Sequence, residues 1–362
     1  MKILVLVSGI GFGDATREHA NIIAIKKKFP KARIMVAGYD NSYLYFKDKF
    51  HTLKIKGYKM PGKSMKVNPV LFGLRNILLP AFWAVETLKV RLQAFNFIPD
   101  LIITDFEPVG LSLSKMFKTK NIVEFGFDPD LYQEYKKNHK IGYAQKVEAT
   151  YFSQLYDQAD IVVIPTFKKR RKKHLRHTYI NPIIRVKPED LPEEKKIMKS
   201  LGLKKKPILI MLGGSDFGTK IAKTINKLAP KFKEHFIIFG GNLNINLQKN
   251  VHYIQYTSDF FKYLKVSKGL ITLAGHSTLS EALVYKKAIL CFPIHNHIEQ
   301  ELNAFTLKDT IQISNKHSPK IVEKELKQFI KDIPKIEKKV AKLNIKASGP
   351  QDLVKIIETI MK

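Results

Sequence analysis

Short apolar runs alternate with amphipathic segments of helical length along almost the whole chain, and this alternation most limits the folds open to it. The run ILVLV at 3–7, for example, is followed by the helix-length segment TREHANIIAIKKKF at 16–29. Short β-branched runs separated by helices are typical of β–α–β units, which assemble into parallel sheets. We therefore predict an α/β fold. The predicted strands cover residues 3–7, 33–38, 101–105, 121–126, 160–165, 207–212, 235–240, 269–274 and 288–293.

Two glycine turns open similar segments in the two halves of the chain. The stretch KILVLVSGIGFGD from Lys2 resembles KPILIMLGGSDFG from Lys206, since each is a strand followed by a glycine turn and a helix. Two such openings predict two Rossmann-like domains in tandem. Between them, residues 165–196 are rich in proline and charge, which is typical of a linker. We expect domains at 1–180 and 181–345, and a terminal helix at 346–362 that could pack back on the first domain.

The first glycine turn departs from the dinucleotide fingerprint. Counted from Gly9, the sixth position of G-x-G-x-x-G holds Asp14 instead of glycine. A nucleotide-dependent oxidoreductase, with Asp40 as the acid that binds ribose, is one rival interpretation. It leaves residues 269–305 without an explanation.

The most informative stretch is 269–305, GLITLAGHSTLSEALVYKKAILCFPIHNHIEQELNAF. A strand is expected to end at Ala274, and a helix to begin at about 277–279 with Glu281 in its first turn. The N–H groups at a helix N-terminus bind anions such as diphosphates, and a carboxylate one turn later can accept hydrogen bonds from ribose hydroxyls. Beyond the next strand, where open α/β sheets bind ligands, the chain offers Glu299, Gln300 and Asn303.

This stretch resembles a known family. The pattern A-G-H-S-x-x-S-E-A-L, a strand ending in proline, and then E-Q-x-x-N-A is similar to the donor half of GT-B nucleotide-sugar glycosyltransferases. The nearest relatives are the bacterial UDP-N-acetylglucosamine transferase of peptidoglycan synthesis and uncharacterised archaeal glycosyltransferases. The resemblance implies two Rossmann-like domains that face each other across a cleft, with the acceptor on the first and the nucleotide sugar on the second. It also implies that neither a metal ion nor another cofactor is needed.

Further stretches carry the same resemblance, namely the glycine loop from Gly9 to Arg17, PDLIITDFEP at 99–108, NPIIR at 181–185 and the glycine turn at 213–215. When the functional residues of the family are matched to this sequence, the resemblance implies that Glu281 binds the ribose. It also implies that Glu299 and Gln300 hydrogen-bond to hydroxyls of the donor sugar with support from Asn303. The alternative is that Glu281 caps its helix and Gln300 is a surface residue. The implied donor-binding residues are Gly213, Gly214, Ser215, Gly275, His276, Ser277, Thr278, Glu281, Glu299, Gln300 and Asn303, and the implied acceptor-loop residues are Gly11, Gly13 and Arg17.

Asp14 stands where the family often has a histidine that takes a proton from the acceptor hydroxyl. An unperturbed aspartate has a pKa of about 3.9, against about 6.5 for histidine, so it is a weaker base at neutral pH. Our hypothesis is that Asp14 is the base, and that Asp105 or Glu107 raises its pKa by bringing a second carboxylate close. The alternative is that Asp14 is only a helix N-cap. His19 lies five residues further on, and helical geometry directs it away.

The charge of the chain points to an anionic partner without choosing one. Sixty-three Lys and Arg against 32 Asp and Glu give a formal net charge of +31 and a pI near 9.9. The basic cluster at 168–177 and Lys26 to Lys28, with the apolar stretch 70–85, could dock the acceptor domain on an anionic membrane. Nucleic acid is the less favoured partner, because no aromatic-interleaved RNA signature accompanies the basic cluster. The alternative is a solvated lysine-rich surface.

The cysteine content argues against a disulfide and against a metal site. The single cysteine, Cys291, lies in the apolar stretch AILCFP and is expected to be buried. Its spacing to His295 and His297, with His276 nearby, matches no zinc site that we recognise. We therefore predict no metal.

The sequence as a whole favours a glycosyltransferase of the hexosyltransferase type. It would move a sugar from a nucleoside-diphosphate sugar, with UDP favoured, to an acceptor hydroxyl with inversion, and the acceptor could be lipid-linked. We expect a cytoplasmic protein that could bind peripherally at the inner membrane face. The alternatives are a non-catalytic polyanion- or lipid-binding protein on a degenerate transferase scaffold and, less favoured, the oxidoreductase. The sugar, the acceptor and the oligomeric state are left open.

Overall fold

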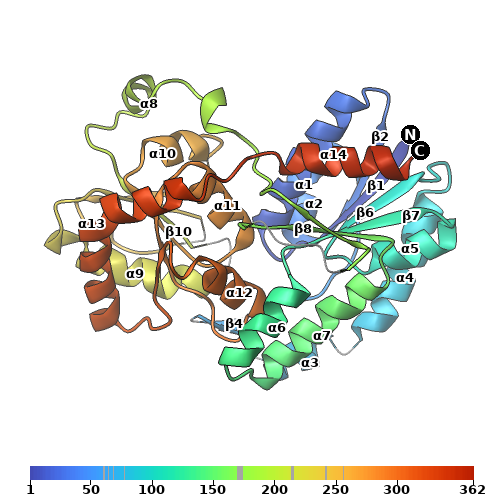
Figure 1. Ribbon diagram of the computed structural model, residues 1–362, viewed down its shortest axis with the longest axis horizontal. Coiled ribbons are helices and arrows are strands. Elements are labelled where there is room, and N and C mark those ends of the chain that lie inside the picture. The colour runs from blue at the N-terminus through green and yellow to red at the C-terminus, as the bar shows by residue number, and fades with distance from the viewer. Residues whose placement is uncertain are drawn as a thin grey trace. The chain divides into compact units, whose positions relative to one another are not determined.

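The computed structural model divides into two compact α/β units (Figure 1). The first unit comprises Met1–Pro61, Asn68–Arg185 and Ala347–Lys362, and the second comprises Gly62–Val67 and Val186–Lys346. The structure describes residues 1–59, 62–63, 65–67, 69–76, 78–168, 174–212, 216–240, 243–255 and 257–362.

The first unit is built on a seven-stranded sheet in the order β3-β2-β1-β6-β7-β8-β9, with every neighbouring pair parallel. Residues 3–7 of β1 and all of β6 are buried, as expected for a parallel sheet that is covered by helices on both faces. Its elements are β1 (Lys2–Val7), α1 (Phe12–Lys28), β2 (Arg33–Gly38), α2 (Asp40–Phe46), β3 (His51–Lys54), α3 (Pro69–Asn76), α4 (Leu79–Gln93), β6 (Leu101–Asp105), α5 (Val109–Phe117), β7 (Lys120–Glu124), α6 (Pro129–Asn138), α7 (Tyr143–Asp157), β8 (Ile161–Pro165), β9 (His177–Ile180) and α14 (Gly349–Ile360).

The second unit has a six-stranded parallel sheet in the order β12-β11-β10-β13-β14-β15, and a two-stranded antiparallel ribbon, β4-β5. Both large sheets reverse their strand order in the middle, at β1 and β6 in the first unit and at β10 and β13 in the second. Its elements are β4 (Gly62–Lys63), β5 (Lys66–Val67), α8 (Glu194–Ser200), β10 (Ile208–Met211), α9 (Thr219–Leu228), β11 (Phe236–Phe239), β12 (Val251–Ile254), α10 (Phe260–Val266), β13 (Gly269–Thr272), α11 (His276–Val284), β14 (Ala288–Cys291), α12 (Ile298–Leu307), β15 (Gln312–Ile313) and α13 (Pro319–Lys342).

All nine predicted strands are present, within one to two residues at their ends. The structure adds strands that the apolar pattern did not indicate. Among these, β3 (HTLK), β9 (HTYI) and β12 (VHYI) are short and partly polar, since they lie at or next to sheet edges. The segment 165–196, where we expected the linker, contains β9, which pairs with β8 at the edge of the first sheet.

The C-terminal helix α14 completes the core of the first unit. Its Leu353 and Ile357 are buried in one cluster with Ile22 and Ile25 of α1. Asn181, just after β9, donates from Nδ2 to Ser348 Oγ at 2.8 Å, which ties the helix to the sheet. The chain thus returns to its first unit after building the second.

Candidate active site

The loop after β1 lies at the point where the first sheet reverses its strand order. β1 pairs with β2 on one side and with β6 on the other, and Val7 lies in register with Asp105 at the end of β6. Open α/β sheets bind ligands at this position, outside the carboxyl ends of the strands. Gly9 begins the turn, and a Cβ there would collide with the carbonyl oxygen of Tyr39. Only glycine permits this close approach.

Asp14 lies inside the first turn of α1. The helix begins at Phe12 with Gly11 as its N-cap, so the interpretation of Asp14 as the N-cap is wrong. Its side chain is 22% exposed, which leaves the carboxylate accessible from outside. His19, by contrast, hydrogen-bonds through Nδ1 with Tyr45 Oη at 2.8 Å.

Arg17 connects Asp14 to the end of the sheet. Its Nη2 donates to Asp14 Oδ1 at 3.1 Å and to Asp105 Oδ1 at 2.6 Å, and its Nε donates to Asp105 Oδ2 at 3.0 Å. The hypothesis drawn from the sequence had Asp105 acting directly on Asp14. The structure instead links the two carboxylates through a guanidinium, and an ion pair of this kind favours the ionised form of a carboxyl. Arg17 itself, implied as an acceptor-loop residue, is buried within these contacts.

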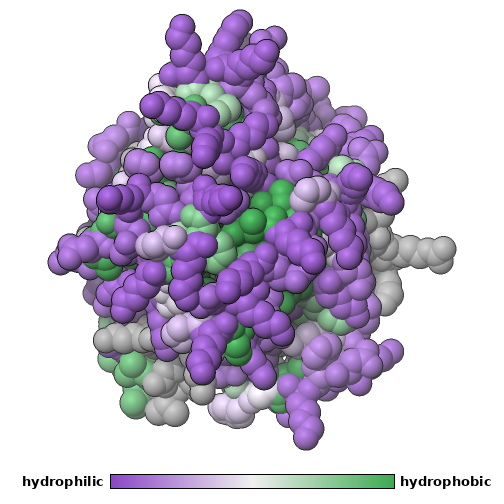
Figure 2. Space-filling model, turned by 90° about the vertical axis from the view of Figure 1, so that its left-hand side faces the viewer, coloured by the Kyte–Doolittle hydropathy of each residue, from purple (hydrophilic) through white to green (hydrophobic). Residues whose placement is uncertain are grey.

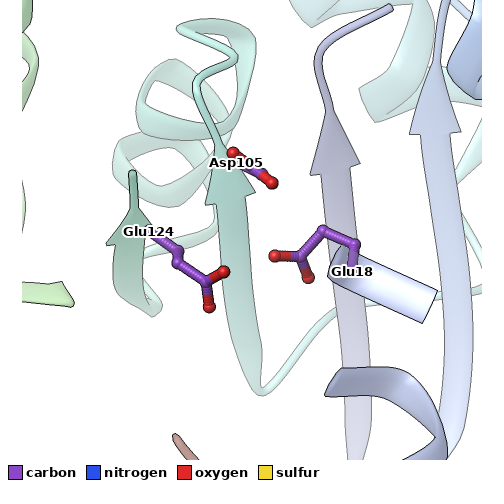
Figure 3. Close-up of side chains that lie close together, drawn as sticks. All are labelled: Glu18, Asp105 and Glu124. Carbon is purple, nitrogen blue, oxygen red and sulfur yellow. The ribbon is translucent and has the colours of Figure 1, made fainter. Parts of the chain in front are cut away.

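Two more acids lie near Arg17, and neither was predicted from the sequence. Glu124 at the end of β7 has Oε1 3.2 Å from Arg17 Nε, and Glu18 follows Arg17 on α1. Asn21 Nδ2 joins them by donating to Glu18 Oε1 at 3.1 Å and to Glu124 Oε2 at 2.8 Å. Figure 3 shows the carboxyl groups of Glu18, Asp105 and Glu124 gathered between α1 and the ends of β6 and β7. We call these three residues the buried acid cluster.

Burial controls the ionisation of the cluster. Removal from water raises the pKa of Glu124 to about 8, and it raises the pKa of Glu18 and of Asp105 as well. One carboxyl oxygen from each of the three residues lies within 4.8 Å of the other two, a spacing that could hold a cation. Arg17 already supplies a positive charge to Asp105 and Glu124. The absence of a metal from the reaction remains a prediction.

A signal for Glu18 and Glu124 exists in the sequence. Asp14, Glu18 and Asn21 recur at helical spacing on the face of α1 that also carries the buried Ile22 and Ile25. Charged residues on the core side of an amphipathic helix are rare unless they are paired. Glu124 ends a strand that was predicted next to LIITD, so two neighbouring strands end in acids.

Glu107, the other candidate for tuning Asp14, lies two residues after β6 in a buried position. Burial raises the pKa of Glu107 to about 8, and its Oε2 has no hydrogen-bond partner among the described residues. Its backbone is fixed by Thr104, whose Oγ1 donates to the Glu107 carbonyl oxygen at 2.5 Å. Burial raises the pKa of Tyr39, and the negative charges of its neighbours Glu107 and Asp14 raise it further. The structure therefore brings Asp14, Asp105 and Glu107 to one edge of the sheet, but in different surroundings.

The implied donor site of the second unit centres on the start of α11. This helix begins at His276 with Gly275 as its N-cap, and no side chain of the described residues caps it. No atom of the described residues lies within 4 Å of a Cβ placed at Gly275, so they leave its backbone open to close approach. Ser277 and Thr278 are partly exposed in the first turn. Glu281 is buried in the second turn, so the expected first-turn position is wrong because the helix begins earlier than predicted.

Gln300 is buried, which contradicts its interpretation as a surface residue. Its Oε1 accepts from the N–H groups of Ala274, at 3.3 Å, and of Ile294, at 3.1 Å. These residues follow β13 and β14, so one amide group holds the two loops together. Asn303, one turn further along α12, donates from Nδ2 to the Ala274 carbonyl oxygen at 2.9 Å and to Glu299 Oε1 at 3.4 Å.

The remaining predicted residues are the glycine turn at 213–215, Cys291 and Gly13. Gly213, Gly214 and Ser215 lie outside the described residues. Cys291 is fully buried in β14, and burial raises the pKa of its thiol, as expected for a small apolar side chain in the core. Gly13 lies in the first turn of α1, where its carbonyl oxygen accepts from Thr16 Oγ1 at 3.0 Å.

Comparison with known proteins points to one family and one fold. The family model described as glycosyl transferase family 1 matches residues 1–334. An uncharacterised glycosyltransferase of Methanosarcina acetivorans is 23% identical, over 99% of this chain and 98% of its own length. MurG of Acinetobacter baumannii has a similar structure, with a TM-score of 0.60, 13% identity, and 99% and 100% of the two chains covered.

Arabidopsis thaliana UGT89C1, solved in complex with UDP, has the same fold, with a TM-score of 0.64, 13% identity and 99% of each chain covered. The two parallel α/β units, their reversed strand orders and the match along most of the chain lead to one assignment. The chain belongs to glycosyl transferase family 1 and is a glycosyltransferase with the GT-B fold.

Proposed function

We propose that this glycosyltransferase transfers a sugar from a UDP-sugar to an acceptor hydroxyl, with Asp14 as the general base. The observation that carries the proposal is the accessibility of Asp14. It shares Arg17 with Asp105 and Glu124, yet its side chain is 22% exposed while theirs are fully buried. Among these acids, Asp14 is therefore the one that an acceptor can reach.

The chemistry is a single displacement. Asp14 takes the proton of the acceptor hydroxyl while the hydroxyl oxygen forms a bond to the anomeric carbon of the sugar. The bond from that carbon to the diphosphate oxygen breaks, and the electron pair leaves with UDP. Attack from the side opposite the leaving group inverts the configuration.

The second unit would bind the donor. The N–H groups at the start of α11, beside Gly275, can stabilise the negative charge that develops on the diphosphate. Glu281 would hold the ribose, and Glu299, supported by Asn303, would read the sugar. UDP is favoured because UGT89C1, which has the same fold, was solved with UDP.

Thermal unfolding with a panel of nucleotides tests this proposal. UDP and UDP-sugars should raise the melting temperature, because a ligand that binds only the folded state stabilises it. NAD should not. Stabilisation by RNA alone would favour the non-catalytic polyanion-binding alternative, and stabilisation by NAD alone would favour the oxidoreductase.

We further propose that α4 contacts an anionic membrane surface. Among the described residues, no helix is both long and apolar enough to span a bilayer. Along α4 and its two ends, however, one face exposes a stripe of large apolar side chains with exposed fractions from 38% to 74%. An exposed apolar patch of this kind marks an interaction surface. We call it the α4 stripe, and it comprises Leu78, Phe82, Val85, Leu88, Leu92 and Phe95.

Basic side chains accompany the α4 stripe. Lys56 Nζ lies 5.0 Å from the centre of the Phe82 ring, and Lys89 and Arg91 lie on α4 itself. Apolar side chains among cations suit a membrane interface with anionic lipids, which would bring a lipid-linked acceptor to the first unit. The basic cluster at 168–177 lies partly outside the described residues. Lys28 is paired with Glu358 at 2.8 Å.

Cosedimentation with vesicles tests the contact. The protein should bind vesicles that contain phosphatidylglycerol more strongly than vesicles of phosphatidylcholine alone, and salt should weaken the binding. Equal binding to both would contradict an anionic contact.

A further inference from the structure

We propose that Glu18 and Glu124 are positioning residues that share a bound proton behind Asp14, and that this proton keeps Arg17 available to Asp14. The inference rests on the proposed function, because it takes Asp14 as the base. It concerns side chains that are buried and do not touch the reacting atoms.

The number of charges in this part of the core supports a bound proton. Glu18, Asp105 and Glu124 are all buried, and the cation that contacts Asp105 and Glu124 is Arg17. Three ionised carboxylates around one buried guanidinium would leave two negative charges uncompensated away from water. Uncompensated buried charge is strongly unfavourable, and a carboxyl in that position takes up a proton instead.

Hydrogen bonding indicates which carboxyl stays ionised. Asp105 accepts from Arg17 through both oxygens, at 2.6 Å and 3.0 Å, which is the two-pronged contact of a carboxylate with a guanidinium. Asp105 is therefore the ionised partner of Arg17. The proton belongs to the remaining pair, Glu18 and Glu124.

The surroundings of that pair suit a state in which Glu18 and Glu124 share one proton and carry one negative charge instead of two. The pair faces Arg17 and Asn21 of α1 and Asp105 of β6, and Asn21 Nδ2 donates to both members. Glu18 Oε2 has no hydrogen-bond partner among the described residues, which is costly for a buried carboxylate oxygen and less so for a neutral carboxyl. Burial raises the pKa of both groups in agreement with this arrangement.

The consequence for Asp14 follows from the donors of Arg17. Nη2 is shared between Asp14 and Asp105, and Nε lies between Asp105 and Glu124. While the pair carries its proton, it places only one negative charge beside Arg17, and the guanidinium keeps its contacts with Asp105 and Asp14. Once the proton leaves, the second negative charge of the pair competes for the guanidinium, and Asp14 loses the contact that orients it.

This role predicts an alkaline loss of activity, which a carboxylate base alone would not give. The measurement is the release of UDP from UDP-N-acetylglucosamine between pH 5 and pH 10. In the wild-type protein, the rate at pH 9 should be about tenfold below the rate at pH 7. The reason is that one pH unit above a single ionisation near pH 8, only about a tenth of the molecules still carry the proton. The apparent pKa belongs to the pair and not to one residue.

Glu124→Gln and Glu18→Gln each replace a carboxyl with a neutral amide of similar shape. In both variants, the decline of the rate at high pH, which we call the alkaline limb, should move upward by at least one pH unit or disappear. Glu337→Gln is the matched control, because burial also raises the pKa of the Glu337 carboxyl, and its charged neighbours, Lys287 first among them, belong to the second unit. Its alkaline limb should stay where the wild-type limb is. An unchanged limb in folded Glu124→Gln and Glu18→Gln would overturn the positioning role.

Infrared spectroscopy tests the proton without any activity. The wild-type protein should show the C=O band of a protonated carboxyl at pH 7, and Glu124→Gln should lose it or shift it. If no such band depends on Glu124 or Glu18, the shared proton is disproved. If the band is present but no UDP-sugar of the panel stabilises the protein or releases UDP, the proposed function fails and the positioning role fails with it, while the shared proton stands.

Discussion

Arg17 and Asp105 form a buried two-pronged ion pair between residues 88 positions apart, with Nη2–Oδ1 at 2.6 Å and Nε–Oδ2 at 3.0 Å. The pair joins the second turn of α1 to the end of β6. It therefore fixes the helix that carries Asp14 at the point where the sheet reverses its strand order. Both the stability of the first unit and the orientation of Asp14 depend on it.

Replacement of Arg17 by lysine should destabilise the protein. Lysine keeps the charge but cannot reproduce the planar fork that binds Asp105 and Glu124 together. We expect the free energy of unfolding in urea to fall by about 3 kcal/mol, the scale for disrupting a buried pair. Arg33→Lys is the control, because Arg33 is exposed, and it should change stability by less than about 0.5 kcal/mol. Equal effects of the two variants would contradict the structural importance of the pair.

Asp14→Asn should abolish transfer and leave donor binding intact. The amide cannot accept the acceptor proton, and loss of a general base lowers rates by about 100-fold to 10,000-fold. UDP release reports the loss, and the stabilisation by UDP reports donor binding. Asp40→Asn is the control, since Asp40 is an exposed aspartate at the start of α2 with φ of 42°, a conformation that asparagine tolerates. Unchanged turnover in Asp14→Asn would refute its role as the base.

Gln300→Ala should destabilise the second unit as well as weaken donor binding. It leaves two backbone N–H groups, those of Ala274 and Ile294, without the oxygen to which they now donate. Each buried unsatisfied group costs about 1–3 kcal/mol. Gln328→Ala removes an exposed glutamine bonded to Asp332 and should have little effect on urea unfolding. If Gln300→Ala weakens UDP-sugar binding without any loss of stability, the side chain reads the sugar and does not hold the loops.

The stability of the protein should fall between about pH 4.5 and pH 8. The folded-state pKa of Glu107 is about 8, above its unfolded value, so the folded state binds more protons in this window. The stabilising contribution is complete below the unfolded pKa and is lost as pH rises through the folded pKa. For Glu107 this amounts to on the order of 5 kcal/mol, since its pKa rises by about 3.5 units and one pKa unit corresponds to about 1.4 kcal/mol.

Urea unfolding at several pH values measures this loss. Glu107→Gln should remove part of the decline between pH 5 and pH 8, because the amide does not titrate. Lys28→Gln alters an exposed pair with Glu358 and serves as the control, with the wild-type slope expected. A Glu107→Gln slope that equals the wild-type slope would mean that Glu107 ionises normally in the folded protein.

Leu88→Glu with Leu92→Glu should reduce binding to anionic vesicles by at least about tenfold. Burial of one leucine side chain is worth about 1.5–3 kcal/mol, and charges on the α4 stripe oppose insertion. Ile23→Glu is the control, since Ile23 is exposed to the same degree as Leu88 but lies on α1. Cosedimentation with phosphatidylglycerol vesicles measures the effect.

A different surface could attract the same vesicles through charge alone. Hydrophilic side chains cover most of the face at the left of Figure 1, where α13 lies (Figure 2). On α13, Lys331, Lys335, Lys338, Lys339 and Lys342 line a shallow hollow with Pro334. If Lys331→Glu with Lys335→Glu abolishes vesicle binding and the α4 variant does not, the membrane contact belongs to α13.

The sequence alone determined the fold class and its nine main strands. Buried parallel strands are continuous apolar runs, and in the helices between them apolar residues recur every three to four positions. Both signals are therefore local in the chain. The same local patterns located the two glycine turns, and the motif from Gly275 to Asn303 indicated the family. Strands such as β9 were missed because a short, partly polar edge strand has no comparable local signal.

Only the tertiary structure decided how the site is assembled. Asp14, Asp105 and Glu124 come from three elements, and their common dependence on Arg17 arises when β1, β6 and β7 lie side by side. The ionisation of Glu124 and the role of Gln300 likewise depend on burial and on partners distant in the chain. Hydrophobic periodicity is a property of neighbouring residues, whereas desolvation and ion pairing depend on everything that surrounds a side chain in three dimensions.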